Sequence, residues 1–173
     1  MKFVIIILAL VFSTLTFAKS SAFIRTTGSK QGLFKGESTA RGREQFAEIL
    51  SYTFEILSPR DPSSGQPTGK RQLRPITIVK DWGASSNQYF TAIATNEVLK
   101  EVRIDFYSND VRSGQEVLER SVVLNNAFVI DAKDSTTVVN GDLQDSQTIT
   151  FNYSKITITD KTGTIFTDDL NQP

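Results

Sequence analysis

Arg74–Tyr107, RPITIVKDWGASSNQYFTAIATNEVLKEVRIDFY, is the stretch of the chain whose local structure is most clearly marked. It opens within a predicted strand, Leu73–Val79, whose β-branched residues suit a sheet. A turn at Asp81-Trp82-Gly83 follows, and Ser85 or Ser86 is expected to cap a helix by accepting a hydrogen bond from a free amide. Four residues share one face of this helix and are expected to pack on a sheet: Tyr89, Phe90, Ile93 and Ala94.

Alternation of apolar and polar residues closes this stretch and recurs on both sides of it. In Val98–Tyr107 the apolar side carries Val102, Ile104 and Phe106, and charged residues occupy the other side. Such a period of two predicts a half-buried strand. Phe46–Ile56 and Val117–Ile130 show the same pattern. In the second of these, five residues are in phase and are expected on one buried face: Leu118, Val122, Leu124, Phe128 and Ile130.

The C-terminal third adds a hairpin and two more strands. Asn140-Gly141 is a strong signal for a two-residue hairpin turn. Gln147–Thr159 is a predicted strand whose apolar side changes near Ser154-Lys155, and a β-bulge there would account for the change. Thr164–Phe166 is a short final strand. The sequence contains no visible internal repeat, so these elements predict one mainly β domain with a single helix.

Two polar segments interrupt the strands. Gly28–Gly42, GSKQGLFKGESTARG, reads as a long loop with an apolar pair, Leu33 and Phe34, at its middle. Because glycines flank the pair, we expect it to form a docking point. Ser58–Arg71, SPRDPSSGQPTGKR, is rich in proline and glycine and has no apolar side chain besides proline. We expect this second loop to be mobile or disordered.

Composition excludes several classes of function. The 173-residue chain has 19 basic and 19 acidic residues and a formal charge of zero, with no basic run that would hold a nucleic acid. It contains neither Cys nor His, which excludes thiol nucleophiles, disulfides, Cys/His zinc sites and imidazole acid–base catalysis. The carboxylates show no calcium-loop spacing. We therefore expect no cofactor and no metal, and the sequence favours a protein that is not an enzyme.

The N-terminus has the form of a secretory signal peptide. A basic Met1-Lys2 start precedes an apolar run, and Thr16-Phe17-Ala18 has small residues at the positions that signal peptidase reads. A spanning helix needs about 20 apolar residues, more than this run supplies. We expect residues 1–18 to be the signal and 19–173 to be a single domain. Ala22 is the alternative candidate for the cleavage site. The mature protein would be secreted or periplasmic, with no stable membrane insertion.

Three parts of the sequence together resemble one family. Arg74–Tyr107 carries the strand, acidic-aromatic turn, Ser-Ser helix start and VLKEVRIDFY strand of that pattern, and Glu48–Phe54 (EILSYTF) and Ser146–Thr157 (SQTITFNYSKIT) flank it in the right order. These segments resemble Hcp, the haemolysin-coregulated tube subunit of bacterial type VI secretion systems. The resemblance implies a compact β-barrel of two packed antiparallel sheets with one short α-helix and an extended loop.

The resemblance also implies a function. Hcp-like barrels form six-membered rings that stack into a tube, and the tube is expelled and carries effectors. The expected partners are copies of the chain itself, in a homohexamer and in stacked rings, with effector or spike proteins. Gly28–Gly42 would correspond to the family's extended loop, so Leu33, Phe34 and Lys35 are candidates for ring-to-ring contact. Asn109 and Asp110 are candidates for contact on the opposite face.

Two alternatives remain open at this point. Typical Hcp subunits lack a cleavable signal, and the signal predicted here favours an exported Hcp-like binding module that acts in the periplasm or outside the cell, apart from a secretion tube. A secreted enzyme is the third hypothesis, and it would depend on carboxylates, Lys, Tyr or hydroxyl groups alone.

Overall fold

Alternating sequence patterns become antiparallel strands over most of the chain. The computed structural model describes residues 20–110 and 113–170. The predicted signal peptide, residues 1–18, lies outside them. The described elements, in chain order, are β1 (Ser21–Gly28), β2 (Ala47–Thr53), β3 (Ile56–Leu57), β4 (Gln72–Leu73), β5 (Ile76–Asp81), α1 (Ser86–Ala94), β6 (Leu99–Asn109), β7 (Glu116–Val139), β8 (Asp142–Asn152), β9 (Lys155–Asp160) and β10 (Ile165–Asp169).

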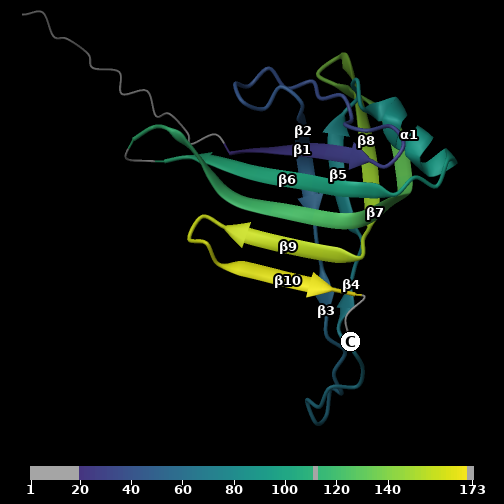
Figure 1. The fold of residues 1–173 in the computed structure, drawn as a ribbon, viewed down its shortest axis with the longest axis vertical. Coiled ribbons are helices and arrows are strands. Elements are labelled where there is room, and N and C mark those ends of the chain that lie inside the picture. The colour runs from purple at the N-terminus through teal and green to yellow at the C-terminus, as the bar shows by residue number, and fades with distance from the viewer. Residues whose placement is uncertain (1–19, 111–112, 171–173) are drawn as a thin grey trace, which may run out of the picture.

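Eight of the strands form one sheet that closes on itself. Their order is β10-β9-β7-β6-β1-β2-β5-β8, and a further pairing of β7 with β8 joins the two sides into a barrel. In Figure 1, β1, β6, β7, β9 and β10 run across the view in one layer, while β2, β5 and β8 run along the vertical axis in another. The two layers correspond to the two packed antiparallel sheets expected from the sequence. Closure leaves fewer open strand edges.

Strand β7 takes part in both layers because it bends at Asn126. Residues up to Ala127 pair with β6 or β9, and residues from Phe128 onward pair with β8. Asn126 has a φ of 48°. This conformation reverses which alternate side chains of the strand point into the core. The expected common face is therefore wrong beyond this point, and it is also wrong at Leu118, which is 38% exposed next to a register shift between β6 and β7. Phe128 and Ile130 are 41% and 51% exposed, whereas Ala127 and Val129 are buried.

The alternation of buried and exposed side chains also changes at two other places, and each change has a local cause. The change near Ser154 is not a bulge in one long strand, as predicted, but a break between β8 and β9, which pair with different neighbours. In β2 the register shifts between Ile49 and Ser51, so Leu50 points outward and is 60% exposed. The hairpin turn at Asn140-Gly141 is confirmed, with positive φ at both residues and Val139 paired with Asp142.

Helix α1 closes one end of the barrel. Its N-cap is Ser85, but the predicted serine cap bond is absent from the described structure, and the Ser85 amide donates instead to Glu37 Oε1 at 3.0 Å. The buried residues are Ser86, Tyr89 and Ala92, while Ala94 of the predicted face is exposed. The ring of Tyr89 reaches into the core between Phe34 and Phe151, with centroids 5.1 and 6.0 Å away.

The segment expected to be a mobile loop, Ser58–Arg71, is the outer part of an ordered hairpin. Strands β3 and β4 pair at its base, and Arg60 and Pro67 form a bridge further out. In Figure 1 this hairpin projects from the lower end of the barrel. Arg71 anchors it through Nε and Nη2, which donate to the two carboxylate oxygens of Asp168 on β10, both at 2.6 Å.

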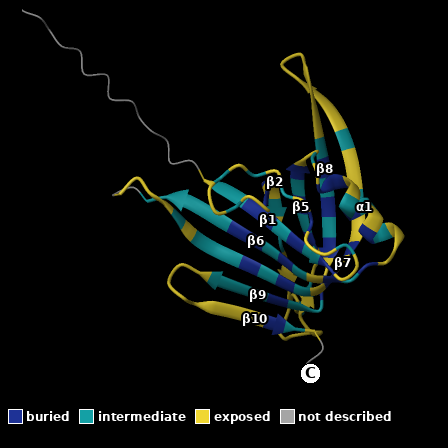
Figure 2. Ribbon diagram, turned by 45° about the horizontal axis from the view of Figure 1, so that its top comes forward, coloured by how far each residue is buried: buried dark blue, intermediate teal, exposed yellow. Residues whose placement is uncertain are grey.

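The core fills the space between the layers. Figure 2 shows buried residues along the inner strands and exposed residues at the projecting tips. Fully buried members include Ile76, Ile78, Leu99, Val102, Ile104, Leu124, Ile149 and Phe151. Within residues 20–110 and 113–170, no helix has both the length and the apolar character needed to cross a bilayer.

Candidate assembly surfaces and the cleft beside the N-terminal loop

The loop after β1 presents only part of its predicted docking point. Leu33 is 45% exposed, and Lys35 is also exposed. Phe34 is 2% exposed and belongs to the core cluster. The expectation that Phe34 makes a ring-to-ring contact is therefore wrong, since its ring would have to leave the barrel. Leu33 and Lys35 remain candidates.

Glu97 and Gln88 hold this loop against the helical end of the barrel. One carboxylate oxygen of Glu97 accepts the Lys30 and Gln31 amides at 2.6 and 2.8 Å. Burial acts to raise the pKa of Glu97, but these donors outweigh it and hold the pKa below its ordinary value. The Lys35 amide donates to Gln88 Oε1 at 2.7 Å. The backbone beside Leu33 is thus fixed, which suits a contact surface.

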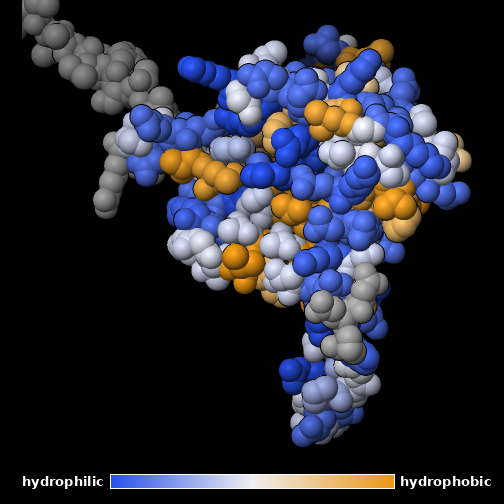
Figure 3. Space-filling model, viewed as in Figure 1, coloured by the Kyte–Doolittle hydropathy of each residue, from blue (hydrophilic) through white to orange (hydrophobic). Residues whose placement is uncertain are grey.

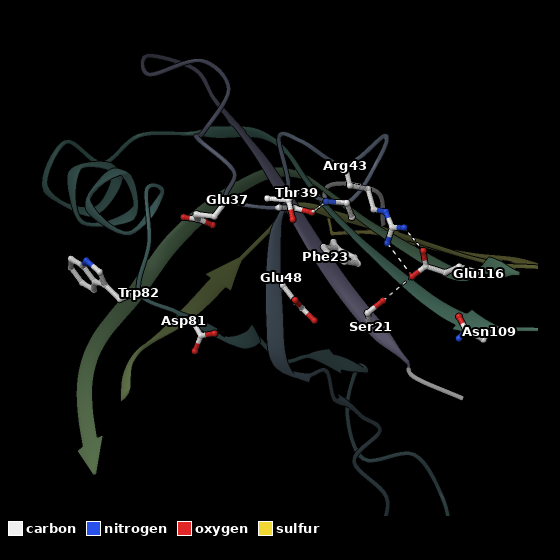
Figure 4. Close-up of a pocket in the computed structure, with 12 residues that line it drawn as sticks. Ser21, Phe23, Glu37, Thr39, Arg43, Glu48, Asp81, Trp82, Asn109 and Glu116 are labelled. Atoms are coloured by element: carbon white, nitrogen blue, oxygen red, sulfur yellow. Dashed lines mark hydrogen bonds and ion pairs between the residues drawn. The ribbon is translucent and has the colours of Figure 1, made fainter. Parts of the chain in front are cut away.

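The second half of the loop forms one wall of a cleft of about 480 Å³. Figure 4 shows Arg43 pointing across it toward Glu116. Arg43 forms an ion pair with Glu116, and its guanidinium lies 4.5 and 4.1 Å from the ring centroids of Phe23 and Tyr107. The hydrogen bond to Glu116 raises the Arg43 pKa. Through these contacts Arg43 holds the loop against β1 and β6.

A buried lysine anchors the other side of this loop. Lys80 is 1% exposed, and its ammonium donates to Asp81 O and Ser86 Oγ at 2.6 and 3.2 Å, with Glu37 Oε1 at 3.7 Å. Burial lowers the pKa of Lys80, and the nearby Glu37 partly opposes this shift. The lysine therefore joins β5, the start of α1 and the loop in one polar network.

Two carboxylates of the cleft face solvent. Glu48 and Asp81 line it as exposed residues, and Trp82 stands at the rim with 39% of its surface exposed. The chemistry of this lining suits a basic ligand bound by charge and by an aromatic face. Sequence reasoning did not find the cleft, because its residues come from separate segments of the chain. The described residues hold no group of three or more potential metal ligands.

Asn109 lies on this cleft as well. It shares the cleft with Glu37, Ser38, Thr39, Ala40 and Arg43 of the loop. Asn109 is thus near the second half of the loop, while Leu33 bridges Thr27 at the other end of β1, so a position of Asn109 opposite Leu33 and Lys35 stays a prediction. The Asp110 carboxylate accepts the Ser113 amide at 2.8 Å and organises the turn after β6. A contact role for Asn109 and Asp110 stays a prediction.

The most extended feature is the β3–β4 hairpin. Gly28–Gly42 was expected to be the extended loop, but most of it is docked on the barrel through Glu97, Gln88 and Glu37. The β3–β4 hairpin instead stands clear of the barrel, and Figure 3 shows it as hydrophilic over the visible face. The apolar patches visible on that face of the molecule in Figure 3 are separate and small.

Comparison with known proteins identifies the architecture. A family model described as type VI secretion system effector, Hcp, matches residues 23–159. The chain belongs to the Hcp family. It is 31% identical over 166 residues to the major exported protein of Pseudomonas aeruginosa, covering 88% of this chain and 96% of that protein.

Solved Hcp structures share the fold. A crystal structure of an Hcp protein matches with a TM-score of 0.79 at 21% identity, covering 86% of this chain and 98% of the other. Hcp1 of E. coli EAEC 042 and the secreted protein Hcp3 of Pseudomonas aeruginosa give 0.75 and 0.73, both at 24% identity, covering 87% and 89% of this chain and 98% and 100% of theirs. The predicted Hcp-like barrel is confirmed.

Proposed function

We propose that this Hcp protein is a tube-forming structural subunit of a type VI-like secretion apparatus, assembling as a homohexameric ring that stacks and carries effectors. The match to the Hcp family over residues 23–159 carries the proposal. The family is one of structural tube proteins, and the chemistry needed for a tube is surface complementarity. A stable interface buries about 1,600 Å² in total, which a barrel of this size supplies on two sides.

Ring formation is tested directly by electron microscopy and light scattering of the purified full chain. We expect particles with six subunits and, at higher concentration, stacks of rings. Contacts between unlike surfaces that close by rotation produce rings, and those that do not close produce filaments. A monomer at every concentration tested would contradict the proposal.

Leu33 and Lys35 are proposed to contribute to ring-to-ring contact. Replacing both by Ser should shorten stacks and leave single rings, because both side chains are exposed. Arg41, which is exposed on the same loop, provides a matched control as Arg41→Ser. Stacks of unchanged length in the double variant would reject this assignment. Asn109→Ala with Asp110→Ala tests the second predicted contact in the same assay.

A second candidate is an exported Hcp-like binding module. The open cleft with Glu48, Asp81 and Trp82 favours it, since these groups suit a basic peptide or amine. The relative named major exported protein supports export of this chain too. N-terminal sequencing of the native protein, with fractionation of the compartments, tests the signal peptide. Processing near Ala18 without assembled rings would favour the module, and rings would favour the tube subunit.

A further inference from the structure

The first strand of the barrel begins almost directly after the predicted signal peptide. Cleavage is expected between Ala18 and Lys19, and β1 begins at Ser21. Only Lys19 and Ser20 therefore separate the expected scissile bond from the sheet. An extended chain spans about 3.5 Å per residue, so this bond stays within about 10 Å of the first residue of β1.

Strand β1 is held in the sheet from both sides. Its pairing with β2 covers Ala22, Phe23 and Ile24, and its pairing with β6 begins at Ser21, which lies opposite Tyr107. A strand between two antiparallel neighbours leaves the sheet only when the backbone hydrogen bonds on both sides break. Opening β1 therefore requires a large part of the barrel to open with it.

Side chains fix the end of β1 that lies nearest the signal. Ser21 Oγ donates to Glu116 Oε1 at 3.1 Å, as Figure 4 shows. Phe23 is 6% exposed and packs edge-on against Tyr107 with ring centroids 5.9 Å apart, and Arg43 covers its ring. Chain ends without such contacts fray and are open to proteases. The start of β1 is instead anchored at its first and third residues.

We propose that the closed barrel protects its own cleavage site, so that removal of the signal precedes the insertion of β1. A protease acts on an extended segment, and it reaches a bond next to a folded sheet only when that segment opens. The spacer of Lys19 and Ser20 is too short to hold the bond clear of the sheet while β1 stays paired. A chain that closes first keeps its signal, and a chain that is processed first is released to fold and assemble. The inference rests on the proposed signal peptide and does not depend on ring formation.

Cleavage of the folded full-length precursor by purified signal peptidase in detergent micelles tests this order. A six-residue Gly-Ser insertion between Ser20 and Ser21 adds about 20 Å of extended chain. We expect the insertion to raise the cleavage rate by about tenfold or more, because the bond becomes accessible while β1 stays paired. The same insertion between Ser64 and Gly65, at the exposed tip of the β3–β4 hairpin, is the matched control and should leave the rate unchanged.

A second variant frees the bond without lengthening the chain. Ile104 is fully buried on β6, opposite Ile24 of β1. Ile104→Asp should prevent closure of the barrel, because it places an unpaired charge in the core. Circular dichroism checks that the barrel is absent. This precursor should be cut as fast as the variant with the insertion after Ser20.

The outcomes separate this inference from the proposed tube function. A folded unmodified precursor that is cut as fast as the Ser20 insertion variant would overturn the inference, and so would slow cleavage of an unfolded Ile104→Asp precursor. Failure of every precursor to be cut would overturn the predicted signal and this inference with it, and would leave ring formation standing. A mature chain that is processed in this order but forms no rings would overturn the tube function alone.

Discussion

Leu33 and Phe34 are neighbours in the chain but differ in environment. The backbone bridge between Thr27 and Leu33 sets the strand direction, so successive side chains alternate between solvent and core. Phe34 packs on Tyr89 at a centroid distance of 5.1 Å, and Leu33 faces outward. The same dipeptide thus supplies a core residue and a candidate contact residue.

Substitution of each residue should separate these roles. Phe34→Ala should lower the free energy of unfolding by about 3–5 kcal/mol, because it leaves a cavity beside Tyr89. Leu33→Ala should change it by less than about 0.5 kcal/mol, as is usual for an exposed site. Urea denaturation of both variants measures the difference. Equal losses at the two positions would contradict the assignment.

At the scale of elements, Asn126 decides which strands β7 can join. Asn126→Val should destabilise the protein by about 1–2 kcal/mol, because a side chain branched at Cβ is strained at the positive φ of 48°. Asn126→Gly should retain most of the stability, since glycine adopts this conformation readily. Thermal unfolding of the two variants tests this, and a valine variant as stable as the glycine variant would show that the bend tolerates either.

The anchor of the β3–β4 hairpin should give a dependence on pH. The hydrogen bond from Arg71 lowers the pKa of Asp168, whose side chain is 3% exposed. A carboxyl with a depressed folded pKa stabilises the fold above its unfolded pKa, near about 3.9, and this contribution is lost as pH falls through the folded pKa.

Arg71→Gln should therefore lower the urea midpoint at neutral pH, and the difference from the unmodified chain should disappear in acid. Lys70→Gln, a change at the next exposed cation of the hairpin, should leave the midpoint unchanged at both pH values. A deficit in Arg71→Gln that persists unchanged in strong acid would mean that the ion pair is not its cause.

At the scale of the whole molecule, barrel closure depends on β1. This strand lies between β2 and β6, and Ala22 pairs with both Ile49 and Phe106. Removing residues 1–19 should leave a folded barrel, whereas removing residues 1–24 should prevent closure and unfold the chain. Circular dichroism and amide hydrogen exchange distinguish the two results. Cleavage after Ala18 therefore preserves the whole strand, while cleavage after Ala22 would remove two of its residues.

Local pattern was enough to predict the class of fold and several elements. The alternation in Val98–Tyr107 predicted β6, and Asn140-Gly141 predicted the hairpin between β7 and β8. Faces were less predictable where a strand bends or changes partner. Beyond Asn126, Phe128 and Ile130 point outward while Ala127 and Val129 are buried, and this inversion depends on the pairing with β8.

The candidate surfaces could be predicted only in part. Leu33 and Lys35 are exposed as expected, but Phe34 is not, and Asn109 lies near the second half of the loop, away from Leu33. Ser58–Arg71 looked like a disordered loop because its composition lacks apolar residues, yet the Arg71–Asp168 bond ties it to a strand 97 positions away. Local composition cannot report such a distant partner.

By itself, the sequence determined a mainly β, Hcp-like chain without imidazole or thiol chemistry, because strand periodicity and residue types are local properties. The tertiary structure decided which apolar residues enter the core, where the cleft forms and which hairpins project. These features depend on barrel closure, which brings together segments such as β1, β6 and the loop carrying Arg43. Their positions follow from long-range pairing, and long-range pairing is visible only in three dimensions.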